Sequence, residues 1–168
     1  MRVMSTVMTW QTYCQGPAET EALGKALGRL LKTGDVVELT ADLGGGKTTF
    51  IRGLAGGAGS QDVVSSPSFT LGNIYKTKKF DIHHYDFYRL SDPGVLANQL
   101  AESLSDPKTI TVVEWGRVVD RVLPGERIVI ELKPDLSDSE KRQIIFNYPD
   151  SKTSMLKQLQ ASRTGVKE

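Results

Sequence analysis

The spacing of hydrophobic positions changes several times along the 168-residue chain, and each spacing predicts a different element. Alternating or short continuous apolar runs rich in β-branched and aromatic residues are typical of strands, whereas apolar residues three and four apart form one helix face. Strands are predicted over residues 7–13, 35–40, 69–75, 80–88, 109–115, 127–133 and 142–148. Helices are predicted over residues 18–31, from residue 50 to residue 54 or 55, and over residues 92–104.

This mixture of strands and helices predicts an α/β fold with three layers. We expect a mixed sheet that is parallel around residues 35–40 and 109–114, with antiparallel hairpins appended at 69–88 and 127–148. Residues 1–150 are expected to form a single domain. Residues 151–168 are expected to be a polar C-terminal tail, weakly helical or frayed.

Composition narrows the class of protein. The formal net charge of +1 does not suggest a molecule that binds nucleic acid with its whole surface. Cys14 is the single cysteine, which excludes an internal disulfide and a zinc site of several cysteines, and it fits a reducing, cytoplasmic setting. No apolar run approaches the ~18 residues of a membrane span. The lysines in the turn at 76–79 suit either a phosphate or acidic partner or an ordinary solvated hairpin turn.

A glycine-rich loop follows the strand at 35–40. It reads Ala41-Asp42-Leu43-Gly44-Gly45-Gly46-Lys47-Thr48-Thr49-Phe50. Strand, glycine loop, Gly-Lys-Thr and helix together form a P-loop, in which backbone N–H groups surround a phosphate. Lys47 is then expected to contact the β- and γ-phosphates, and the hydroxyl of Thr48 to bind Mg2+. Ala41 stands where the motif has its first glycine.

Two later strands end in carboxylates. Asp86 lies on the same predicted strand face as His84 and Tyr88. It can activate a water or hold one of the waters on Mg2+, or it can pair with a base or cap a turn. His84 is better explained as a packed, hydrogen-bonded residue than as a catalyst. Glu114 ends an apolar strand in the Walker B manner, which would bring it to the Mg2+ side of the sheet.

Two further residues each admit two explanations. Ser68 belongs to a hydroxyl-rich segment, Ser65–Thr70, that directly follows the P-loop helix. That position suits a segment that senses the γ-phosphate, or a capped turn that leads into a strand. Trp115 either stacks near a nucleotide or fills the core.

These four motifs, in this order, resemble the TsaE family. The resemblance is carried by the Lys47-Thr48-Thr49 loop, by Ser66-Pro67-Ser68-Phe69-Thr70-Leu71, by His84-Tyr85-Asp86-Phe87-Tyr88-Arg89-Leu90 and by Val113-Glu114-Trp115. It runs from about Trp10 to Tyr148. The chain departs from the family's usual loop at Ala41 and Gly45.

The resemblance implies a three-layer P-loop NTPase-type domain that binds ATP and Mg2+ and acts as an ATPase, weak alone and stimulated by partners. It implies that residues 42–49, Ser68 and Trp115 bind the nucleotide, that Thr48 and Glu114 bind the metal, and that Asp86, Lys47 and Glu114 support hydrolysis. It further implies that the chain acts on the partner pair TsaD and TsaB in threonylcarbamoyladenosine modification of tRNA. It would contact tRNA only through that complex and would have no membrane partner. It would not itself transfer the threonylcarbamoyl group.

The residues alone leave two other classes open. A P-loop kinase of small molecules or nucleosides could use Arg117 and Arg121 as a phosphate-clamping lid, although they fit a helix face better. A nucleotide-gated binding module with negligible hydrolysis would need the same loop. A GTPase is disfavoured, because the chain has no N-K-x-D motif.

Overall fold

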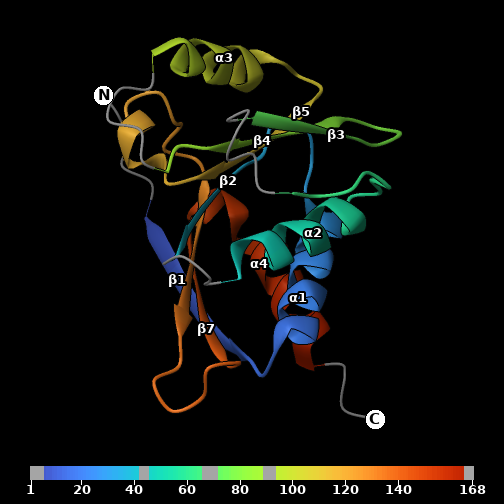
Figure 1. Ribbon diagram of the computed structural model, residues 1–168, viewed down its shortest axis with the longest axis vertical. Helices are drawn as coiled ribbons and strands as arrows, with labels where there is room; N and C mark the ends of the chain where they lie inside the picture. The colour runs from blue at the N-terminus through green and yellow to red at the C-terminus, as the bar shows by residue number, and fades with distance from the viewer. Residues whose placement is uncertain (1–5, 42–45, 66–71, 89–93, 165–168) are drawn as a thin grey trace.

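The computed structural model describes residues 6–41, 46–65, 72–88 and 94–164 (Figure 1). Within these ranges seven strands form one sheet, in the spatial order β1-β7-β6-β2-β5-β4-β3. The strands are β1 (Val7–Cys14), β2 (Val36–Ala41), β3 (Gly72–Lys76), β4 (Asp81–Asp86), β5 (Thr109–Glu114), β6 (Ile128–Pro134) and β7 (Arg142–Pro149). The helices are α1 (Pro17–Leu30), α2 (Lys47–Gly57), α3 (Gly94–Ser105) and α4 (Thr153–Thr164), with short 3-10 turns η1 (Gly116–Val119) and η2 (Asp150–Lys152).

The sheet is mixed, as the sequence predicts. β2 runs parallel to β5 and β6, and β5 runs parallel to β4. The pairs β3–β4, β6–β7 and β1–β7 are antiparallel. β5 is buried along its whole length and β2 at all but one position, because both faces of the parallel centre are covered. The α/β fold class and the mixed sheet are therefore confirmed.

Helices cover both faces of this sheet and make three layers (Figure 1). One face packs against α1, α2 and α4, and its buried residues include Ile82 and Val112. The other face packs against α3 and η1, and its buried residues include Tyr85 and Val113. Alternation along β4 and β5 thus sends neighbouring side chains to opposite layers.

Glycines allow α1 and α2 to pack with their backbones almost in contact. A Cβ at any of four helical glycines would lie 2.0–2.2 Å from a backbone oxygen of the other helix: Gly24, Gly28, Gly53 and Gly57. The same packing corrects one prediction. α2 continues to Gly57 rather than ending at residue 54 or 55, because Gly57 lies directly on the backbone of Lys25.

The C-terminal segment contributes a helix to the same layer. Residues 153–164 form α4, and its Leu156 and Leu159 have no exposed surface. Residues 153–164 of the predicted tail are therefore helical rather than frayed. The domain boundary expected at residue 150 stays a prediction. None of the helices in the described part of the chain has the length and apolar character of a membrane span.

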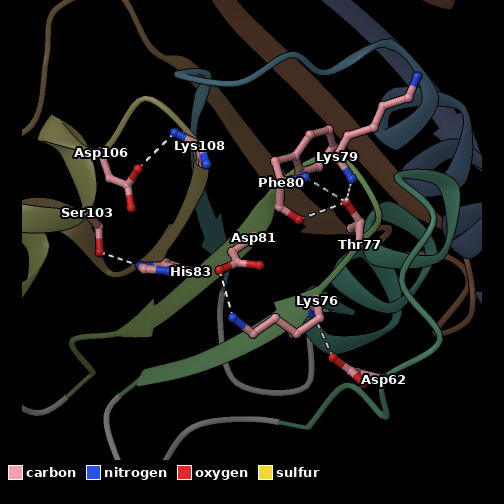
Figure 2. Close-up of polar contacts among 10 residues, drawn as sticks. All are labelled: Asp62, Lys76, Thr77, Lys79, Phe80, Asp81, His83, Ser103, Asp106 and Lys108. Atoms are coloured by element: carbon pink, nitrogen blue, oxygen red, sulfur yellow. Dashed lines mark hydrogen bonds and ion pairs between the residues drawn. The ribbon is translucent and has the colours of Figure 1, made fainter.

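The β3–β4 hairpin ends in an ordered turn (Figure 2). The Thr77 hydroxyl donates to the carbonyl of Phe80 and accepts from the N–H groups of Lys79 and Phe80. Lys76 forms an ion pair with Asp81 at 2.8 Å. Further along β4, His83 bonds the Ser103 hydroxyl at 2.6 Å, which ties the hairpin to α3.

Candidate functional site

The carboxyl ends of three parallel strands meet beside the start of α2. In the strand register Glu114 of β5 lies opposite Leu39 of β2 on one side and opposite Asp86 of β4 on the other. Ligands of open α/β sheets bind at this edge, outside the carboxyl ends of the strands. The two carboxylates predicted as functional therefore lie on adjacent strands.

Lys47 is the first residue of α2 and turns back toward the end of β2. Its Nζ donates a hydrogen bond to the carbonyl of Ala41 at 2.9 Å. The preceding Gly46 has a left-handed φ of +94°, which glycine adopts without strain. No side chain in the described part of the chain caps this helix start, and its first turn carries no acidic residue. The positive end of the helix is thus open to an anion.

Trp115 lies against Lys47. The Lys47 ammonium is 4.8 Å from the centre of the indole ring, and the ring of Tyr88 packs against the same indole at 5.0 Å. Trp115 has a φ of +57°, a conformation that costs a residue with a Cβ on the order of 1 kcal/mol. The half-buried indole lies beside Lys47 immediately after Glu114, and it also packs against the buried cluster that includes Val113, so both explanations for Trp115 stay open.

Glu114 is buried and hydrogen-bonded. It is 3% exposed, and its Oε2 lies 2.9 Å from Nε2 of His84, itself 1% exposed. The other ring nitrogen of His84 lies 3.0 Å from the Tyr75 hydroxyl, which also bonds the carbonyl of Ser65 at 3.1 Å. His84 is therefore the packed, hydrogen-bonded residue that the sequence predicts.

Asp86 is half-buried at the edge of this cluster. Its Oδ1 accepts a hydrogen bond from the N–H of Tyr88 at 2.9 Å, so it caps the turn that follows β4. Burial raises the pKa of the Asp86 carboxyl, and the negative charge of Glu114 raises it further. The Tyr88 N–H, His84 and Lys47 act in the opposite direction on the same pKa. A carboxyl whose pKa is raised in this way is suited to proton transfer.

A network of charged groups supports the chain where it leaves β5. Arg127 donates from Nε to Oε2 of the buried Glu38 at 2.7 Å, and from its other nitrogens to the Pro124 carbonyl at 2.9 Å and to Asp120 at 2.8 Å. Gly116 lies against the other oxygen of Glu38, where a Cβ would be only 2.6 Å from Oε1. The path of the backbone after Trp115 is thus fixed by contacts on both sides.

The structure brings the predicted residues Lys47, Glu114, Asp86 and Trp115 together. Thr48 and Thr49 are half-buried in the first turn of α2. The remaining predicted site residues, Asp42, Leu43, Gly44, Gly45 and Ser68, lie outside the described residues. Across the described ranges, no group of three or more His, Cys, Asp or Glu side chains forms a metal site. Thr48 and Glu114 offer one hydroxyl oxygen and one carboxylate. Such a small set of protein ligands fits Mg2+, which usually takes only one or two protein oxygens and fills its shell with water and phosphate.

A cavity of about 800 Å3 adjoins the cluster. Its lining includes Ala41 and Trp115, the cation Arg117, and the end of β6 at Leu132–Pro134. Pockets for small ligands commonly have volumes of about 300–1,000 Å3. The cavity therefore offers room for a small ligand beside Trp115 and the end of β2.

Two aromatic residues of the site are not identified from the sequence as part of it. Tyr88 contacts Trp115, and Tyr75 contacts His84 from the neighbouring strand. Period two places Tyr88 on the Asp86 face, which was a usable signal. No comparable signal existed for Tyr75, because its contact depends on the register of β3 against β4.

Comparison with known proteins gives one consistent family. A family model described as "Threonylcarbamoyl adenosine biosynthesis protein TsaE" matches residues 14–144. The chain is 33% identical over 149 residues to tRNA threonylcarbamoyladenosine biosynthesis protein TsaE of Bacillus subtilis, covering 89% of this chain and 90% of that protein. It is 35% identical over 145 residues to the protein of the same name from Rickettsia felis, covering 86% and 83%. The crystal structure of Bacillus subtilis YdiB superposes with a TM-score of 0.78 at 31% identity, over 94% of this chain and 98% of that chain.

Proposed function

Because the chain belongs to the TsaE family, we propose that it binds and hydrolyses Mg-ATP in the service of tRNA threonylcarbamoyladenosine biosynthesis. The role in tRNA threonylcarbamoyladenosine biosynthesis follows from membership of the family. ATP, Mg2+ and hydrolysis are proposed from the site.

The meeting of Lys47, Glu114 and Asp86 at one sheet edge carries the proposal. A cation at an uncapped helix start and two carboxylates at adjacent strand ends are the groups needed to hold a polyphosphate and its divalent metal. Lys47 would exchange the Ala41 carbonyl, now 2.9 Å from its Nζ, for a phosphate oxygen. The backbone of Asp42, Leu43, Gly44 and Gly45 would complete the phosphate loop.

Thr48 and Glu114 are the residues that would hold Mg2+. When bound, the metal would neutralise phosphate charge and orient the transferred group. Asp86 would accept a hydrogen bond from the attacking water and take its proton, a role that its raised pKa favours. Ser68 would contact the γ-phosphate, and Trp115 would form the wall of the cavity that takes the nucleoside.

TsaD and TsaB are proposed as the partners. The resemblance to the family supports this proposal. The chain would contact tRNA through the complex of these two partners. A family member that supplies only ATP-driven conformational change would show weak hydrolysis alone and faster hydrolysis with the pair. No transfer of the threonylcarbamoyl group is assigned to this chain.

Lys47→Ala tests the nucleotide site. Loss of a charge-assisted contact of about 1.5–3 kcal/mol should weaken Mg-ATP binding by roughly 10- to 100-fold in isothermal titration calorimetry. Lys157→Ala, which removes an exposed lysine of α4, is the matched control and should leave the affinity unchanged. Equal affinities of wild type and Lys47→Ala would overturn the phosphate assignment.

Glu114→Gln tests the metal assignment separately. The variant keeps the size of the side chain but removes the charge, so Mg2+-dependent hydrolysis should fall further than metal-free ADP binding. Hydrolysis is measured for the chain alone and with the TsaD–TsaB pair, with Lys47→Ala as the blank. Absence of any stimulation by the pair would remove the partner proposal and leave a nucleotide-binding module.

A further inference from the structure

The turn between β3 and β4 borders a cavity of about 490 Å3 at the far ends of α1 and α2. The two helices run in the same direction, because Gly24 faces Phe50 and Gly28 faces Leu54 further along both helices. Both therefore end near the start of β4, whereas Lys47 begins α2 at the opposite edge of the sheet. The 11 residues of α2 separate this cavity from the candidate nucleotide site by about 16 Å.

Three cations line the cavity, and no carboxylate is among its described lining residues. Lys78 and Lys79 come from the hairpin turn, and Arg29 comes from the last turn of α1. All three are exposed, and within the described residues none of them forms an ion pair. Lys76 is already paired with Asp81, and in Figure 2 the Lys79 side chain extends away from that pair. The cavity thus carries an unbalanced positive charge, on a chain whose formal net charge is only +1.

The turn holds the backbone of these lysines in one arrangement. The Thr77 hydroxyl bonds three backbone groups of residues 79 and 80, and the N–H of Thr77 donates to the carbonyl of Phe80 at 3.1 Å. The N–H of Lys76 donates to Asp62 at 2.7 Å, which ties the hairpin to the segment after α2. The charges therefore project from a fixed backbone, and binding an anion would cost little ordering of the loop.

The carboxyl end of α2 does not need the lysines as hydrogen-bond donors. The carbonyls of Leu54, Ala55 and Gly56 already accept backbone N–H groups from the turn after the helix. The dipole of a helix end still favours nearby cations. A purely structural role for Lys78 and Lys79 is therefore the alternative that an experiment must separate from ligand binding.

We propose that this cavity binds phosphate groups of an RNA backbone. Lysine and arginine contacts to phosphates position a nucleic acid without reading its sequence. An acidic protein segment is the poorer match, because protein interfaces are depleted in lysine and depend on buried aromatic or apolar anchors. The aromatic residue of the lining, Phe80, is itself packed against the core.

The family's role in tRNA modification supplies the RNA. The inference rests on that role but not on the proposed binding of ATP or Mg2+. It adds a direct contact with tRNA to the one made through TsaD and TsaB.

An NMR titration of the isotope-labelled protein with a tRNA transcript locates the contact. Signals of Arg29, Lys78 and Lys79 should shift, with a dissociation constant on the order of 10⁻⁴ M, the weak end of non-specific nucleic-acid binding. Three phosphate contacts predict a slope of log K against log salt concentration of about −2.1 to −2.7, which is a roughly 20- to 40-fold loss of affinity between 50 and 200 mM KCl. Absence of shifts at the cavity in 50 mM KCl would overturn the proposal.

Variants that change one charge test the lining. Lys78→Gln and Lys79→Gln should each flatten the salt slope by about 0.7–0.9. Lys157→Gln, which removes an exposed lysine of α4, is the matched control and should leave the slope unchanged. Gln61→Glu keeps every cation and adds a carboxylate to the lining, so it should weaken RNA binding as well. Equal effects of Lys78→Gln and Lys157→Gln would show attraction by net charge alone and overturn the site.

The nucleotide site provides a separate control. Lys47→Ala should bind RNA like wild type, and Lys78→Gln should bind Mg-ATP like wild type, so failure of either proposal leaves the other measurable. Loss of RNA binding in Lys47→Ala would place the RNA at the nucleotide site and overturn the inference.

Two further measurements exclude other roles for the cations. Lys78→Gln and Lys79→Gln should keep the urea midpoint of wild type, and a lower midpoint with unchanged RNA binding would assign the lysines to the helix ends instead. Poly-glutamate and inorganic phosphate are titrated at the same charge concentration as the tRNA. Equally large shifts of the same signals with either anion would show a general anion site and overturn the RNA assignment.

Discussion

Gly116→Ala should destabilise the protein through a single added methyl group. Gly116 follows Trp115, and a Cβ there would lie 2.6 Å from Oε1 of Glu38 and 2.9 Å from a methyl carbon of Leu123. Both distances are shorter than real Cβ contacts. The end of a glutamate can usually swing away, but Glu38 is held on its other oxygen by Arg127 at 2.7 Å. The methyl group therefore either strains the packing or breaks the ion pair.

The two routes have similar costs. Overpacking a well-filled site costs about 1–3 kcal/mol, and losing a hydrogen bond between charged groups costs about 1.5–3 kcal/mol. The free energy of unfolding should therefore fall by about 2 kcal/mol, which lowers Tm by roughly 4–8 °C for a chain of this size. Because Trp115 is adjacent, nucleotide affinity should fall as well.

Urea denaturation of wild type, Gly116→Ala and Gly125→Ala measures the effect. Gly125 lies in the same connection before β6, and a Cβ there would meet no atom within 4 Å, so that variant is the matched control. The reasoning is refuted if Gly116→Ala loses less than about 0.5 kcal/mol, the scatter of ordinary surface substitutions.

Two further outcomes are expected. Leu156→Ala should lower the free energy of unfolding by about 2–5 kcal/mol in the same assay, because Leu156 of α4 is fully buried, and an effect below about 0.5 kcal/mol would exclude α4 from the cooperative unit. Burial lowers the pKa of His83, and nearby Lys76 adds to this while Asp81 and Asp106 oppose it. The unfolded chain then binds the proton more readily, so stability should fall as the pH drops below about 6.5 and be fully present above it. His83→Gln should flatten this loss in denaturation series from pH 7.5 to 5, and an unchanged slope would contradict the assignment.

The elements that carry the candidate site could be predicted because each has a strong local pattern. Glu114 ends β5, and Lys47 follows the loop after β2. Both strands are covered on both faces, and such strands show as mainly apolar runs. Period two along residues 80–88 placed His84 and Asp86 on one face. Parallel strands with their carboxyl ends at one edge then brought the two carboxylates together, although the sequence does not state the strand order.

Contacts between distant segments could not be predicted. α2 extends to Gly57 because α1 offers it a glycine-lined surface, and nothing local to residues 54–57 signals this. Burial of Leu159 requires that α4 pack against the layer of α1, whereas the sequence around it is mostly polar. Trp115 adopts a left-handed conformation that its residue type disfavours, and no local sequence pattern indicates it.

Strand order also sets when this protein can fold during synthesis. Of the seven strands in the described sheet β1 is made before the others, yet Val7 pairs with Pro149 of β7. β2 lies between β5 and β6, so the strand that leads into Lys47 gains both neighbours only after most of the chain is made. Such long-range pairings must close large loops before they gain contacts, which makes folding slow and leaves strand edges exposed on the nascent chain. Lys47 and Glu114 can therefore meet only after synthesis has passed β5, and β1 gains its partner strand only when β7 has been made.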